Sequence, residues 1–325
     1  MKTPFFFLLS VVFLIEAVGC VTAPSQTSAP TALPTAIPQP APTVTPAPTP
    51  TPTPAPDLGP WKLLRQLKYK DNDSAINFGA FLNESHGILV GDSGLVRYTS
   101  NGGQNWDIGN NSSLCLFGLD IVDEQIAWNC GNNAQVRVST DGGATWKPVT
   151  DYGKSEPDHC RYLSFLDAQT GWAAAPEMLG ATLDGGVTWT DLSLPKGTSK
   201  IAAISLRTPT EGYVLDIQGV LLVTADGGKT WTLRSLSLPK GGKLPMDFSP
   251  LVAMRFWDAQ HGRVVYLLSG QFWTATTEDG GVTWKQQAMP DVKGIYNLFL
   301  TRDGQTLSAI NVMKREILIL QYQQP

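Results

Sequence analysis

The feature that most constrains the fold is a short phrase repeated at regular spacing along the chain. Asp-Gly-Gly-x-Thr-Trp occurs four times, and a degenerate copy, Asn-Gly-Gly-Gln-Asn-Trp, precedes them. The five tryptophans stand at positions 106, 146, 189, 231 and 284, so successive spacings are 40, 43, 42 and 53 residues. Regular spacing of this kind indicates an array of equivalent structural units.

The repeated phrase is typical of a tight turn between two β-strands. An aspartate can accept hydrogen bonds from turn N–H groups, and two glycines tolerate the positive φ angles that such a turn needs. The tryptophan at a fixed offset is expected to pack beneath the turn. We therefore predict structural roles for the Asp and Trp of each of the four copies: Asp141 with Trp146, Asp184 with Trp189, Asp226 with Trp231, and Asp279 with Trp284.

Each unit also carries two strand signals upstream of its turn, as in residues 163–166 and 171–174. Four short strands in about 42 residues are typical of a propeller blade. The sequence predicts an all-β chain with a single β-propeller of six four-stranded blades, with seven as the alternative. Residues 60–64 resemble a lone fourth strand and residues 317–320 a third strand without a fourth, so an N-terminal strand is expected to close the ring.

These repeats resemble the Asp-box (BNR-type) repeats of sialidase-like and sortilin-like propellers. Over residues 58–325 the chain looks most like the photosystem II assembly and stability factor family. That resemblance implies an extracytoplasmic propeller that binds proteins. The chain differs from the family in its long Pro/Thr spacer, and in a unit count nearer six than the seven blades expected there.

The first 20 residues resemble a lipoprotein signal peptide. Lys2 precedes an apolar run from Phe5 to Ile15, which is too short to span a bilayer, and small residues lead to Cys20. We expect Cys20 to be lipidated, with an uncleaved anchor or an ordinary signal peptide as alternatives.

Residues 21–57 consist mainly of Pro, Thr, Ala and Ser and predict a disordered spacer. Extended as polyproline II, the spacer would reach about 110 Å. The expected organisation is a signal peptide over 1–20, a spacer over 21–57 and a propeller over 58–325. It implies an exported protein, lipid-anchored to the membrane and facing the periplasm or the cell exterior.

No catalytic or metal-binding constellation is evident in the sequence, and we expect neither an enzyme nor a cofactor. The three histidines and four cysteines are not arranged at metal-ligand spacing. A sialidase-like glycosidase or another secreted carbohydrate-active enzyme is the alternative, although the Arg-Ile-Pro phrase of sialidases is missing. The formal net charge of −4 disfavours nucleic acid as a partner.

Three cysteines follow the lipidation site, so one must remain unpaired within the chain. Cys115 and Cys130 fall in the first two strands of the second unit, which suggests a cross-strand disulfide. Cys160 in the neighbouring unit is the rival partner.

Basic residues gather in the loops that join one predicted blade to the next. We expect these loops to share the face opposite the Asp-box turns and to dock an acidic protein or glycan, acting as a binding or assembly scaffold in a monomeric protein. Solvated surface lysines are the alternative. The candidate binding residues are Lys154, Arg161, Lys196, Lys240, Lys243 and Lys293.

Overall fold

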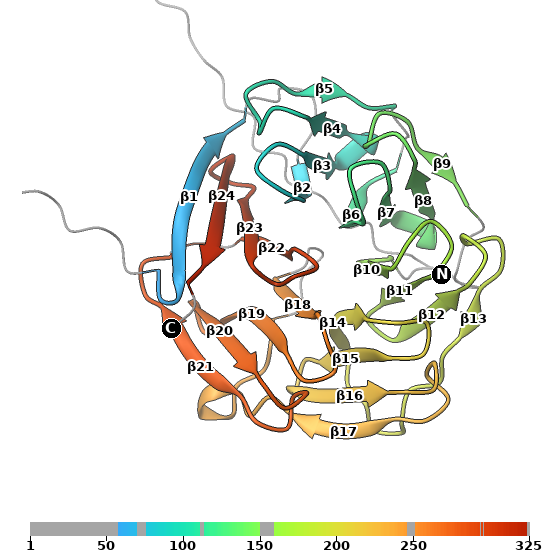
Figure 1. The fold of residues 1–325 in the computed structure, drawn as a ribbon, viewed down its shortest axis with the longest axis vertical. Helices are drawn as coiled ribbons and strands as arrows, with labels where there is room; N and C mark the ends of the chain where they lie inside the picture. The colour runs from blue at the N-terminus through green and yellow to red at the C-terminus, as the bar shows by residue number, and fades with distance from the viewer. Residues whose placement is uncertain are drawn as a thin grey trace, which may run out of the picture. The chain divides into compact units, whose positions relative to one another are not determined.

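The computed structural model describes residues 58–69, 76–110, 114–149, 159–245, 251–292, 294 and 296–323. Its strands form six separate four-stranded antiparallel sheets. Figure 1 shows these sheets as blades placed around a common centre, each with its first strand innermost. The predicted six-bladed propeller is therefore confirmed, and the described residues contain no seventh sheet.

Blades 1 to 5 each use four consecutive strands of the chain. Blade 1 contains β2 (Ile76–Phe81), β3 (Gly87–Gly91), β4 (Val96–Thr99) and β5 (Asp107–Ile108). Blade 2 contains β6 (Leu116–Ile121), β7 (Ala127–Gly131), β8 (Val136–Ser139) and β9 (Lys147–Pro148). Blade 3 contains β10 (Tyr162–Phe165), β11 (Gly171–Ala175), β12 (Met178–Thr182) and β13 (Thr190–Asp191).

The next two blades have longer outer strands. Blade 4 contains β14 (Ile201–Leu206), β15 (Gly212–Asp216), β16 (Val220–Thr224) and β17 (Thr232–Ser235). Blade 5 contains β18 (Val252–Phe256), β19 (Gly262–Leu268), β20 (Gln271–Thr277) and β21 (Lys285–Met289). Three single-turn 3-10 helices lie in connecting loops: η1 (Asp92–Gly94), η2 (Asn132–Ala134) and η3 (Pro239–Gly241).

Blade 6 joins the two ends of the folded part. It contains β22 (Asn297–Leu300), β23 (Thr306–Asn311), β24 (Glu316–Tyr322) and, as its outer strand, β1 (Trp61–Lys68). The β1–β24 register runs from Trp61 opposite Tyr322 to Lys68 opposite Glu316. Figure 1 shows the blue β1 beside the red β24. The predicted closure by an N-terminal strand is confirmed.

The hydrophobic core lies between neighbouring blades. The second strands of blades 1 to 4 are buried at every position, as expected for strands covered on both faces. Aromatic rings join adjacent blades: Trp128 stacks on Phe165 at 3.8 Å between centroids, and Tyr213 stacks on Phe256 at 3.6 Å. Each blade therefore buries its faces only by having two neighbours.

The Asp-box turns are held by hydrogen bonds from the aspartate and the preceding hydroxyl. Asp141 Oδ1 accepts from the Thr145 N–H at 2.8 Å, and Oδ2 accepts from the Thr145 hydroxyl at 2.6 Å. The Gly143 N–H donates to Ser139 Oγ at 2.9 Å. The same three hydrogen bonds, two from the Thr to the Asp carboxylate and one from the second Gly to the preceding hydroxyl, recur around Asp184, Asp226 and Asp279.

The tryptophans pack under these turns. Trp146 is 3% exposed, and its indole N–H donates to the Gly143 carbonyl at 2.9 Å. Trp189 and Trp284 meet Phe165 and Phe256 edge-on. Trp231 donates across to Ser193 in the preceding blade at 3.0 Å. Each Asp-box turn thus anchors its blade and, in blade 4, reaches the blade before it.

The predicted disulfide between Cys115 and Cys130 is wrong. Cys130 is bonded to Cys160, with the Cα atoms 5.6 Å apart, and Cys115 is free. Cys115 lies just before β6, where its carbonyl accepts from the Asn132 N–H at 3.0 Å, and the residue opposite Cys130 is Gly118. The Cys130 sulfur therefore lies beside blade 3, where Cys160 enters.

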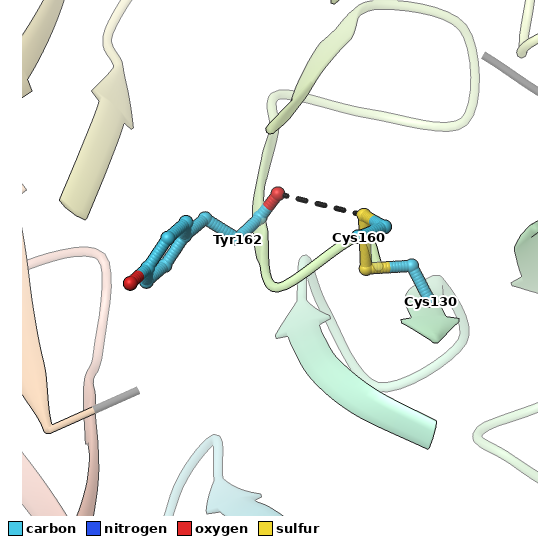
Figure 2. Close-up of a disulfide and its surroundings, with 3 residues drawn as sticks. All are labelled: Cys130, Cys160 and Tyr162. Carbon is cyan, nitrogen blue, oxygen red and sulfur yellow. Dashed lines mark hydrogen bonds between the residues drawn. A yellow bond between two sulfur atoms is a disulfide. The ribbon is translucent and has the colours of Figure 1, made fainter. Parts of the chain in front are cut away.

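Figure 2 shows the bridge together with Tyr162. The Cys160 sulfur lies 3.9 Å from the Tyr162 carbonyl oxygen. Because a disulfide sulfur carries no proton, we treat this as a polar contact. The bridge joins the second strand of blade 2 to the segment that leads into blade 3.

Candidate binding face and central channel

The strand order sorts the loops onto two faces. In each blade the loop from first to second strand and the turn from third to fourth lie at the same end, because the strands are antiparallel. The Gly142, Gly185, Gly227 and Gly280 N–H groups accordingly donate to carbonyls of the first loop of their own blade. We call this end the Asp-box face. The remaining loops, including those between blades, form the linker face.

The two faces carry opposite charge among the described loops. The Asp-box face holds twelve carboxylates and three basic residues, Arg207, Lys229 and Arg302. The linker face holds seven basic residues and three carboxylates, Asp92, Glu177 and Asp291. Its basic residues are Arg161, Lys196, Lys200, Lys240, Lys243, Lys314 and Arg315. Among the described loops, basic residues therefore gather at the linker face and carboxylates at the Asp-box face.

Four of the six predicted binding residues are described, and all four lie on the linker face. Lys196, Lys240 and Lys243 are exposed in inter-blade loops, and Arg161 is half-buried just before β10. Lys154 and Lys293 lie outside the described residues, as does Cys20. The sequence interpretation missed Lys200 in an inter-blade loop, and Lys314 and Arg315, which lie in the loop between the second and third strands of blade 6.

A channel runs between the innermost strands of the six blades. It holds about 400 Å³, including open solvent at its mouth, and residues of all six inner strands or their entries line it. Figure 1 shows β2, β6, β10, β14, β18 and β22 converging on this centre. Its walls are mostly apolar, with Arg161 and Tyr162 where the chain enters β10. Burial raises the pKa of Tyr162 to about 12, opposed by the charge of Arg161, so the phenol stays protonated at neutral pH.

Buried ionic contacts close the channel toward the Asp-box face. Asp120 is 0% exposed, and its carboxylate receives Arg255 from blade 5 and the Phe165 N–H, at 2.7 Å, from blade 3. Arg255 also donates to Ser164 Oγ at 3.1 Å. Arg302 lies 3.9 Å from Asp120 and donates to the Phe165 carbonyl. These contacts connect four blades.

This cluster links blades that are far apart in the sequence through its charged and polar groups. Burial lowers the pKa of Arg302, and the Asp120 carboxylate opposes that shift. Both Asp120 oxygens are engaged, Oδ1 by Arg255 and Oδ2 by the Phe165 N–H. A sequence signal for the cluster existed: Asp120, Ser164 and Arg255 each occupy the position before the last in an apolar inner strand.

The residues that line the channel include two arginines and a tyrosine but no Asp, Glu, His or Cys. Among the described residues, no group of three or more His, Cys, Asp or Glu side chains is placed to hold a metal ion. No helix in the described part of the chain is long and apolar enough to cross a bilayer.

Comparisons with known proteins agree with this architecture. The BNR/Asp-box repeat model matches residues 137–148. The photosystem II assembly lipoprotein Ycf48 of Synechococcus sp. (strain CC9902) is 31% identical over 166 residues, which cover 50% of this chain and 47% of the relative. The alignment thus spans about half the length of that curated relative.

Solved structures share the fold. One described as YCF48 bound to D1 peptide superposes with a TM-score of 0.51 at 18% identity, covering 84% of this chain and 97% of that one. A catalytically inactive virginiamycin B lyase from Staphylococcus aureus, solved with quinupristin, gives 0.54 at 13% identity, covering 80% and 99%. The chain is therefore an Asp-box propeller similar to Ycf48, on a fold that enzymes also use. The resemblance expected from the repeats is confirmed.

Proposed function

We propose that this chain is a non-enzymatic, lipid-anchored scaffold that binds an acidic protein surface through its linker face. The observation that carries the proposal is the separation of charge between the two faces. Seven basic residues lie in the described linker-face loops, on a ring held rigid by inter-blade packing. Complementary charge steers encounter and fixes orientation, so an acidic partner is favoured at this end.

The related proteins support protein binding. The curated relative is described as an assembly lipoprotein, and the solved YCF48 structure holds a peptide of D1. By analogy, we infer a role in which this propeller holds a partner in place while a larger complex forms. The name of the relative refers to photosystem II. For this chain we propose only that the partner presents an acidic surface.

We further propose that residues 1–20 direct export, that Cys20 is acylated, and that residues 21–57 are a spacer between the membrane and the propeller. The apolar run and the small residues before Cys20 support the first two points, and the Pro/Thr composition supports the third. Acylated N-terminal anchors place such a domain outside the cytoplasmic membrane.

Capture of partners from detergent-solubilised membranes tests the docking face. The variant carrying Lys196→Glu, Lys240→Glu and Lys243→Glu should recover at least about tenfold less of the main partner, because the charge of the face is inverted. A matched control changes three exposed lysines elsewhere: Lys62→Glu, Lys147→Glu and Lys229→Glu. Unchanged capture by the first variant, or equal loss in the control, would rule out docking through the linker face.

The same cells test the anchor. The Cys20→Ser chain should leave the membrane fraction and fail to incorporate labelled fatty acid, while the propeller itself remains folded. Continued membrane retention and labelling of that variant would contradict acylation at Cys20.

A further inference from the structure

Blade 6 is the one blade whose third and fourth strands come from opposite ends of the folded part. Since β24 ends at Tyr322 and β1 begins at Trp61, no Asp-box turn joins them. In blade 5 that turn fills the space beside blade 4: a Cβ on Gly281 would lie 2.5 Å from Leu221, and Arg234 donates to the Gly280 carbonyl. The corresponding space between blades 5 and 6 lacks such a turn.

A groove occupies this space. It holds about 1770 Å³, including its open mouth, and it is lined by the outer strands of blade 5, the loop after β18 and the two chain segments that meet in blade 6. Segment 58–60 packs against blade 5, since a Cβ on Gly59 would lie 2.4 Å from the Ala288 carbonyl oxygen, and Pro60 lines the groove that remains. The groove is thus a direct result of how the ring is closed.

Two aromatic rings in the groove are fixed in place. The Arg263 guanidinium lies 5.3 Å from the centre of the Trp257 ring and 3.4 Å from that of Tyr322. Trp257 also rests on the backbone, because a Cβ on Gly304 would lie 2.5 Å from its ring. Both rings remain half-buried. Rings held in this way need little reordering when a ligand arrives.

The charged groups at the rim of the groove occur in pairs of opposite sign, and Arg263 lies beneath the aromatic rings. Lys285 contacts Glu278 at 3.2 Å, and His261 contacts Asp258 at 2.8 Å. Arg263 is 3% exposed beneath the aromatic rings. Beside these pairs, the groove offers a ligand aromatic surface together with neutral hydroxyl and carboxamide groups: Thr276, Gln287 and Gln305.

We propose that this groove binds a neutral oligosaccharide. A sugar ring has an apolar C–H face that suits stacking on an indole, and its hydroxyls both donate and accept hydrogen bonds, as carboxamides do. Trp257 supplies the stacking surface, while Gln287, Gln305 and Thr276 bind the hydroxyls. The groove adjoins the Asp-box face, so a glycan and a protein on the linker face can be held at the same time.

Titration calorimetry with uncharged hexasaccharides tests the site. The probes are cellohexaose, laminarihexaose and chitohexaose, with a hexagalacturonate and a Pro/Thr peptide as charged and non-sugar comparisons. At least one neutral probe should bind, and Trp257→Ala should weaken it about tenfold or more. Gln287→Ala should weaken it less, through the loss of a single group.

Leu166→Ala is the matched control, because Leu166 occupies the position of Trp257 in blade 3, as the shared backbone hydrogen bond shows. It should leave affinity unchanged. The proposal fails if no neutral probe binds at millimolar concentration, if the charged saccharide or the peptide binds in preference, or if Trp257→Ala and Gln287→Ala bind as the parent does. The linker-face variants bear on partner capture alone, so the two proposals fail separately.

Discussion

At the scale of single residues, the Asp-box aspartates stabilise turns through several hydrogen bonds each. The Thr230 hydroxyl and then its N–H lower the pKa of Asp226 to about 2, and Thr283 does the same for Asp279. Both carboxylates are exposed, so solvent weakens their influence on the stability of the whole domain. The degenerate first unit uses Asn101 in the same place, where its side-chain oxygen accepts from the Asn105 N–H at 3.0 Å.

These shifts predict an acid-sensitive component of stability. The folded pKa of about 2 lies below the value of about 3.9 for an unfolded aspartate, so the stabilisation is complete above that value and is lost as the pH falls toward 2. Asp226→Asn with Asp279→Asn retains an acceptor but cannot titrate, and should flatten the dependence. Urea unfolding at pH 4, 3 and 2 measures it, and parallel curves for variant and parent would contradict the assignment.

At the scale of elements, blades are stable only as neighbours, and the disulfide reinforces one such junction. Cys130 and Cys160 are separated by 30 residues and tie blade 2 to the entry of blade 3. Loop closure of that length in the unfolded chain is worth about 3–4 kcal/mol in the chain-entropy treatment.

Removal of the bridge should therefore destabilise the propeller. Cys130→Ala with Cys160→Ala is expected to lower the free energy of unfolding by about 3 kcal/mol, measured by chemical denaturation without reductant. Cys115→Ala is the control and should change it little. Peptide mapping of the unreduced protein checks the pairing itself, and a Cys115-containing disulfide would show the assignment to be wrong.

Five blades followed from the spacing of the four Asp-Gly-Gly-x-Thr-Trp copies and their degenerate first copy, and the sixth followed from the strand signals at residues 60–64 and 317–320. The disulfide did not, because Cys115 lies just before β6 and the residue opposite Cys130 is Gly118. The channel cluster joins Asp120 to Arg255, 135 positions away. The groove similarly collects Trp257, Gln287 and Tyr322 from two blades. Local patterns carry no information about such distant partners.

At the scale of the whole propeller, one outer strand decides whether the ring is closed. The β1–β24 ladder extends from Trp61 to Lys68, and beyond it the Gln323 N–H donates to the Pro60 carbonyl at 2.8 Å. Without β1, the edge of β24 would be an unpaired, mostly apolar strand, which is prone to intermolecular pairing.

A chain that begins at residue 76 should therefore melt at a lower temperature than the parent and elute as oligomers from a sizing column. A chain that begins at residue 58 keeps β1 and should match the parent in both measurements, because residues 1–57 precede the propeller. A monomeric residue-76 chain with an unchanged melting temperature would show that β1 is dispensable for closure.

Ring closure also sets an order of events during synthesis. A ribosome makes β1 first and β24 last among the strands, so the earliest strand has no partner until Glu316–Tyr322 has emerged. A chain that has not yet reached β24 is consequently an open arc with unpaired strand edges. Proteases and chaperones can recognise such an arc, so ring closure marks the point at which β24 has been made and has paired with β1.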